Sequence, residues 1–146
     1  GPEAPAIEAE VTRRGLQETV QLHGHLSHEA KDALVAGADL HLSASQGEGF
    51  GLSVLEAAAQ GVPTVAYDVD GLRESIRDGI TGWLAPEDAL TDLTETALKE
   101  LADPRRREEV AEACRAWAAT FDWDASAHRV AELIAGAVTA QRGRRR

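Results

Sequence analysis

The sequence contains no methionine, a single cysteine and few aromatic residues. Cys114 has no partner for an internal disulfide, so the chain fits a reducing compartment. Because aromatic residues make up only 4% of the chain, its core must be mainly aliphatic. No apolar run approaches the roughly 18 residues of a membrane-spanning helix. No basic segment followed by an apolar one opens the chain, as a secretory signal would.

Positive charge is also scarce, because 25 acidic residues outnumber 15 basic ones and the net charge is −10. This balance argues against a nucleic-acid-binding protein, since phosphate backbones attract net positive charge. The exception is the basic tail at residues 142–146, which we expect to be a solvated chain end. Arginine supplies 13 of the 15 basic residues, and together with the many alanines this bias indicates a GC-rich bacterial genome.

The length of 146 residues suits a single domain, and the apolar fraction of 43% argues against disorder. A chain of this size buries roughly 70% of its unfolded surface, so it needs no disulfide to fold. The missing initiator methionine indicates a piece of a longer chain or a processed one.

Strand-like and helix-like segments alternate from residue 6 to residue 84. This order predicts an α/β fold with a parallel sheet of about four strands and flanking helices. The last third of the chain has a helical pattern almost throughout. The expected strands cover residues 20–23, 39–43, 63–67 and 82–85. The expected helices cover residues 6–14, 28–36, 52–60, 72–77, 87–102, 105–120 and 124–140.

A glycine-rich turn at residues 46–51, called the glycine turn below, separates the second expected strand from the next helix. Ligands of open α/β sheets bind at the carboxyl ends of strands, and a helix N-terminus offers unpaired N–H groups to an anion. Gly49 and Gly51 let a ligand approach the backbone closely. Glu48 and Glu56 would repel phosphate, so they suit sugar hydroxyls better.

The same spacing has an alternative interpretation, in which the glycines make a tight turn and both glutamates are solvated. Spacing alone slightly favours this alternative, because two glycines before a helix are a weak signal. The turn is not a P-loop, since no Gly-Lys-Ser/Thr follows, and its glycine spacing differs from that of the dinucleotide-binding fingerprint.

Residues 48–56, EGFGLSVLE, place seven residues between two glutamates and resemble the E-x7-E motif of retaining GT-B glycosyltransferases. Three stretches between residues 57 and 84 resemble the motifs that follow in that family. Upstream, residues 20–24 resemble its V-x-F-x-G strand. The resemblance covers roughly residues 1–125 and implies a partial, Rossmann-like GT-B C-terminal domain.

In that family, the residue matching Glu48 holds the catalytic position and contacts hydroxyls of the donor sugar, and the residue matching Glu56 binds the ribose. Backbone amides between them face the sugar and the diphosphate, and residues after the first strand lie near the base. The resemblance therefore implies a nucleotide-sugar donor, transfer with retention, and no cofactor or essential metal. The protein would position the donor and stabilise its diphosphate leaving group. The implied substrate-binding residues are Gly49, Phe50, Gly51, Leu52, Ser53, Glu56, His25 and Leu26.

The chain departs from the family at its N-terminal side. Gly1-Pro2-Glu3 resembles the family's turn after its second strand, and a Gly-Pro start is equally typical of a cloning scar. The family's Arg and Lys, which neutralise the diphosphate, precede that turn, and so does its acceptor-binding N-terminal domain. We therefore expect residues 1–146 to be a single, incomplete nucleotide-sugar-binding domain that is inactive on its own and meets its acceptor through the missing domain.

Family sheets run in the order 3-2-1-4-5-6, of which this chain would supply strands 3, 4, 5 and 6. Open strand edges invite pairing with another chain, so we expect a homodimer or a rearranged sheet. We expect the protein to be cytoplasmic, or peripheral to the membrane in the full-length enzyme.

The second function class that fits is a non-catalytic sugar-nucleotide-binding or interaction module, which keeps the motif as part of its fold. Other reactive side chains favour structural roles. His23, His25 and His28 fit no recognised metal-ligand spacing, and Cys114 suits a small buried position in a helix. The residues expected to anchor the core or a domain contact are Trp117, Phe121 and Trp123.

Overall fold

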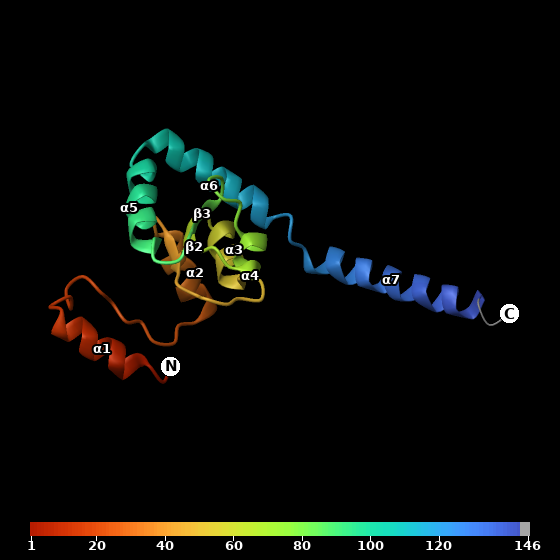
Figure 1. Cartoon of the computed structure of the whole chain (residues 1–146), viewed down its shortest axis with the longest axis horizontal. Helices are drawn as coiled ribbons and strands as arrows, with labels where there is room; N and C mark the ends of the chain where they lie inside the picture. Colours follow the sequence, from red (N-terminus) through yellow and green to blue (C-terminus); the bar gives the residue numbers. More distant parts are fainter. Residues whose placement is uncertain (144–146) are drawn as a thin grey trace. The chain divides into compact units, whose positions relative to one another are not determined.

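The computed structural model describes residues 1–143, and Figure 1 shows its elements. The contacts divide the chain into two compact units, one ending at Leu34 and the other beginning at Val35. The expectation of one incomplete domain stays a prediction. The helices are α1 (Ala4–Arg13), α2 (His28–Ala36), α3 (Leu52–Ala59), α4 (Asp70–Ser75), α5 (Leu90–Leu101), α6 (Pro104–Ala118) and α7 (Trp123–Gly143). The strands are β1 (His41–Ser43), β2 (Thr64–Tyr67) and β3 (Gly82–Ala85).

The first helices form close to where the sequence predicts them. After α1 ends, Gly15 takes a left-handed φ of 68°, which suits glycine and stops the helix. Ser27 caps α2, because its Oγ accepts a hydrogen bond of 3.2 Å from the backbone N–H of Ala30. The expected helix 28–36 has the observed bounds of α2.

The first expected strand, residues 20–23, is wrong, because the structure contains no strand there. The N–H of Val20 instead donates to the carbonyl of Leu16 at 2.8 Å and closes a turn. A strand needs a neighbouring backbone for its hydrogen bonds, and within residues 1–143 the sheet pairs only β1, β2 and β3. The apolar side chains of Val20 and Leu22 stay 36% and 45% exposed.

The sheet therefore has three strands instead of about four, in the spatial order β1-β2-β3, and both pairings are parallel. Leu42 aligns with Val65, and Val65 with Trp83. The flanking helices and the parallel sheet confirm the expected α/β fold class, with a helical C-terminal part. The homodimer expected from open sheet edges stays a prediction.

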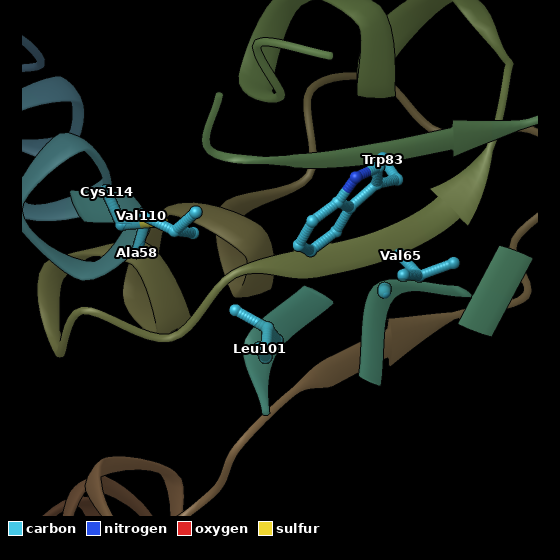
Figure 2. Packing of buried hydrophobic residues seen from close by; sticks show 7 residues of the cluster. Ala58, Val65, Trp83, Leu101, Val110 and Cys114 are labelled. Carbon is cyan, nitrogen blue, oxygen red and sulfur yellow. The ribbon is translucent and has the colours of Figure 1, made fainter. Parts of the chain in front are cut away.

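The core lies around the central strand β2, whose residues alternate between two clusters. Val65 belongs to a cluster that includes Trp83 and residues of α5 and α6, drawn in Figure 2. Its neighbour Ala66 belongs to a second cluster with Val54 and Leu72 of α3 and α4. Because successive strand residues point to opposite faces, helices cover both sides of β2. The first cluster consists of Ala58, Val65, Trp83, Ala97, Leu101, Val110 and Cys114.

Two expected helices begin elsewhere for local reasons. The helix expected from residue 87 begins at Leu90, because Asp88 has a φ of 71° and cannot continue a helix. The helix expected from residue 105 begins at Pro104, where Asp103 caps it by accepting a 3.0 Å hydrogen bond from the N–H of Arg105.

Two sequence expectations concern the exterior. None of the helices within residues 1–143 is both long enough and apolar enough to cross a bilayer. The basic tail expected at residues 142–146 ends in residues 144–146, which lie outside the described residues.

Candidate functional site

The candidate site consists of the glycine turn and the first turn of α3, which follow β1 directly. Gly51 caps α3 in a left-handed conformation, with φ 83° and ψ 57°. Its carbonyl accepts hydrogen bonds from the N–H groups of Val54 at 3.0 Å and Leu55 at 3.4 Å. The amides before Val54 are the first N–H groups of the helix, which have no acceptor inside it. They and the positive end of the helix dipole suit an anionic ligand.

Helix α4 packs against the glycine turn. A Cβ at Gly51 would lie 2.8 Å from Cδ2 of Leu72 and 3.0 Å from Oγ of Ser75. A Cβ at Gly71, in the first turn of α4, would overlap the backbone carbonyl of Glu48 and lie 2.6 Å from the carbonyl carbon of Gly49. Glycine at position 71 lets α4 pack against the backbone of the turn, and glycine at position 51 leaves room for the side chains of Leu72 and Ser75.

Glu48 and Glu56 are both exposed, on either side of the N-terminus of α3. Glu48 bends back onto the turn, because its Oε1 accepts a 3.0 Å hydrogen bond from the N–H of Gly49. Glu56 lies one turn into α3, close enough to His41 on β1 for its charge to act on that imidazole. Burial lowers the pKa of His41 below its ordinary value, and the Glu56 carboxylate partly opposes this.

Glu56 also lines a cavity of about 440 Å³ with Phe50 and Leu52. The lining also includes Phe121, in the segment between α6 and α7, and Trp123, the first residue of α7. Phe121 contacts the ring of Phe50 but is 37% exposed, and Trp123 is 78% exposed, so neither anchors a core cluster within the described residues, and their role in a domain contact stays a prediction. Sequence reasoning did not connect this segment with the motif, since the spacing of residues 48–56 carries no information about residue 121.

A second cavity, of about 320 Å³, lies where the three strands end. Gln46 follows β1, Tyr67 ends β2 and Glu87 follows β3, with Asp68 beside them. This cluster is not among the residues expected from the sequence, although its members could have been found from their positions after expected strands. Asp68 is not a free carboxylate, because its Oδ1 accepts a 2.5 Å hydrogen bond from Nε of Arg73.

Glu48, Glu56 and the residues between them all belong to the second unit, whereas two predicted residues belong to the first. His25 and Leu26 belong to the first unit, where they line a cavity of about 500 Å³ before and along α2. The glycine turn belongs to the second unit, so their role beside a base stays a prediction. Within the described part of the chain, no group of three or more His, Cys, Asp or Glu side chains is arranged to hold a metal ion. The expectation that transfer needs no metal also stays a prediction.

Known proteins resemble the chain over most of its length. The family described as Glycosyl transferases group 1 matches residues 1–117. Alpha-D-kanosaminyltransferase of Streptomyces kanamyceticus is 33% identical over 112 residues, 77% of this chain and 29% of that protein. D-inositol 3-phosphate glycosyltransferase of Streptomyces griseus is 33% identical over 135 residues, 92% of this chain and 28% of that protein.

Solved structures share the fold. Sucrose-phosphate synthase from Thermosynechococcus elongatus superposes with a TM-score of 0.83 and 29% identity, covering 96% of this chain and 35% of that one. Anabaena HepE in complex with UDP-glucose superposes with a TM-score of 0.78 and 25% identity, covering 90% of this chain and 36% of that one. The chain thus spans between 28% and 36% of the length of these four proteins. By sequence and by fold, it belongs to the group 1 family of glycosyltransferases.

Proposed function

We propose that this chain is the donor-binding part of a retaining glycosyltransferase and that its E-x7-E motif holds a nucleotide-sugar. The observation that carries the proposal is the placement of Glu48 and Glu56 on either side of the N-terminus of α3. A diphosphate fits the N–H groups of the helix end, and hydroxyl-bearing groups on both sides of it fit the carboxylates.

Each residue then has a separate part in binding. Glu48 accepts hydrogen bonds from hydroxyls of the donor sugar. It does so through its second carboxylate oxygen and through the remaining lone pairs of Oε1, which already accepts a hydrogen bond from the N–H of Gly49. Glu56 accepts hydrogen bonds from the ribose. The backbone of Gly49, Phe50 and Gly51, with the side-chain-free surface of the glycines, lets the sugar and diphosphate come close.

The chemical contribution of these residues is to position the donor and to stabilise the leaving group. When the bond from the sugar to the diphosphate breaks, negative charge grows on the departing phosphate oxygen. Fixed N–H groups of Leu52 and Ser53 at the positive end of α3 would stabilise that charge without reorganising. The acceptor and the groups that complete catalysis would come from outside this chain, so we propose that the isolated chain binds the donor without transferring its sugar.

The nucleotide is tested first with uridine nucleotides. Anabaena HepE is described in complexes with UDP and UDP-glucose, which makes these two molecules the first probes. Calorimetric titration of the 146-residue chain with UDP, GDP and ADP should give binding of one nucleotide. Glu56→Ala should weaken that binding about tenfold or more, because hydrogen bonds to a charged group contribute most.

A matched control separates the site from general effects of charge. Glu95→Ala removes an exposed carboxylate on α5 that pairs with Lys99 at 3.7 Å, and surface pairs of this kind contribute little. This variant should bind as the unaltered chain does. Binding that Glu56→Ala leaves intact, or no binding of any nucleotide, would contradict the proposed donor site. Binding of UDP-glucose with no loss on Glu48→Gln would instead favour a sugar-nucleotide-binding module without catalysis.

A further inference from the structure

Aromatic rings in edge-to-face contact connect the glycine turn to the end of α6. Phe50, within the turn, meets Phe121 edge to face, with ring centroids 5.4 Å apart and planes 65° apart. Phe121 meets Trp117 in the same manner, with centroids 4.8 Å apart and planes 87° apart. In such pairs the positive edge of one ring faces the negative face of the other, so the contact fixes orientation as well as distance.

Trp117 is in turn held by the C-terminal end of α4. Its Nε1–H donates a 2.9 Å hydrogen bond to the carbonyl of Ser75, and the guanidinium carbon of Arg77 lies 4.5 Å from the centroid of its ring. The side chain of Ser75 also packs directly against Gly51. The same helix end therefore supports the turn twice, once directly at Gly51 and once through the rings of Trp117 and Phe121.

We propose that Phe121 is a positioning residue for the glycine turn, acting through Phe50. Phe50 is two residues after Glu48, whose carboxylate is bound to the N–H of the intervening Gly49. If the ring of Phe50 loses its neighbour, the backbone at Gly49 can rotate and the carboxylate moves with it. The proposal takes its ligand from the proposed function, in which this carboxylate receives the donor sugar.

The position of the turn can be measured without any ligand. The N–H groups of Val54 and Leu55 both donate to the carbonyl of Gly51. The rates of hydrogen exchange at these two amides therefore report how often their hydrogen bonds to the glycine turn open. In the full chain, Phe121→Ala should speed exchange at both amides about twofold to tenfold, the range expected from losing one edge-to-face pair. Phe121→Tyr, which keeps the ring, should restore the original rates.

Two comparisons separate this role from general stability. Leu133→Ala truncates an apolar side chain on α7 that is 68% exposed, and it should leave exchange at Val54 and Leu55 unchanged. Amides within α5 serve as an internal reference in every variant. Unchanged rates in Phe121→Ala would overturn the proposal, and so would an acceleration at Val54 and Leu55 no larger than that in α5.

A binding measurement then tests the consequence for the donor. Phe121→Ala should weaken the binding of UDP-glucose more than that of UDP, because Glu48 on the turn is assigned to the donor sugar, which UDP lacks, and Glu56 to the ribose, which both molecules carry. Equal weakening of both molecules overturns the positioning role. If the unaltered chain binds neither molecule, the proposed donor site fails, and the exchange rates still decide whether Phe121 positions the turn.

Discussion

Gly71 and Glu48 touch through their backbones, because the first turn of α4 lies directly against the carbonyl of Glu48. The contact joins two motif segments that lie more than twenty residues apart in the sequence. It gives Gly71 a structural reason for being glycine, since any side chain would enter the space of the glycine turn. The shape of the candidate site therefore depends on α4 as well as on residues 48–56.

Gly71→Ala should distort the glycine turn and weaken nucleotide-sugar binding, because its methyl group would lie within 2.6 Å of the carbonyl carbon of Gly49. Backbone atoms cannot move aside as the end of a flexible side chain can. Calorimetric titration with UDP-glucose and a thermal melt of the same sample measure both effects. Gly136→Ala is the matched control, since Gly136 also lies in a helix and a Cβ there meets nothing within 4 Å. That control should bind normally, and an unchanged affinity in Gly71→Ala would refute the contact.

Gly61→Ala should lower the free energy of unfolding by about 1–2 kcal/mol, the cost of a left-handed residue that is not glycine. Gly61 has a φ of 81° just after α3. Its N–H donates to Ala58 at 2.9 Å and the N–H of Val62 to Ala57 at 3.0 Å, which closes the helix end. The new methyl group would also meet the guanidinium of Arg115, which is flexible.

Chemical denaturation of Gly61→Ala with and without Arg115→Ala separates these two causes. The backbone strain remains when the Arg115 side chain is removed. The double variant should therefore have a lower free energy of unfolding than Arg115→Ala alone, by most of the amount that Gly61→Ala costs the unaltered chain. Full recovery would mean that the cost comes from the guanidinium contact and not from the left-handed backbone.

The pKa of His41 lies below its ordinary value of 6.5 because the side chain is buried, and the charge of Glu56 opposes this lowering. Glu56→Gln should therefore lower the pKa of His41 further, which an NMR titration of its ring protons measures. Below pH 6.5 the imidazole of His41 is protonated more fully in the unfolded chain than in the folded chain. The contribution of His41 to stability is therefore lost as the pH falls. This loss should be larger in Glu56→Gln, and an unchanged His41 titration would place Glu56 farther from β1 than the structure does.

Cys114 should resist thiol reagents at pH 8 in the folded chain. Burial raises the pKa of its thiol to about 11, and its Sγ lies 3.4 Å from the carbonyl oxygen of Thr81, to which the thiol donates. The reactive thiolate is therefore scarce and enclosed. A colorimetric disulfide reagent should give no reaction in buffer and one equivalent in denaturant. Reaction in buffer at the rate of an exposed thiol would contradict the burial of α6 against the core.

Local signals predicted much of the second unit. The strand at residues 82–85 has the bounds of β3, and the stop at Gly61 is a left-handed glycine as its position after a helix indicated. These features depend on backbone preferences of single residues and on short apolar patterns, which the sequence carries directly. The glycine turn could be placed for the same reason.

Features that depend on distant partners could not be predicted in this way. The pattern at residues 20–23 suits a strand, but pairing decides whether a strand forms, and the turn at Leu16 takes the N–H of Val20 instead. The contact between Phe50 and Phe121 joins segments far apart in the sequence, so no spacing rule reveals it.

The central claim is that a nucleotide-sugar binds at the N-terminus of α3, and the most direct test is an amide NMR titration of the full chain with UDP-glucose. We predict that the largest shifts occur at the amides of Gly49 to Ser53, with a further shift at Glu56. Saturable binding that leaves these amides unmoved, with the largest shifts on α7 or α5, would contradict the account.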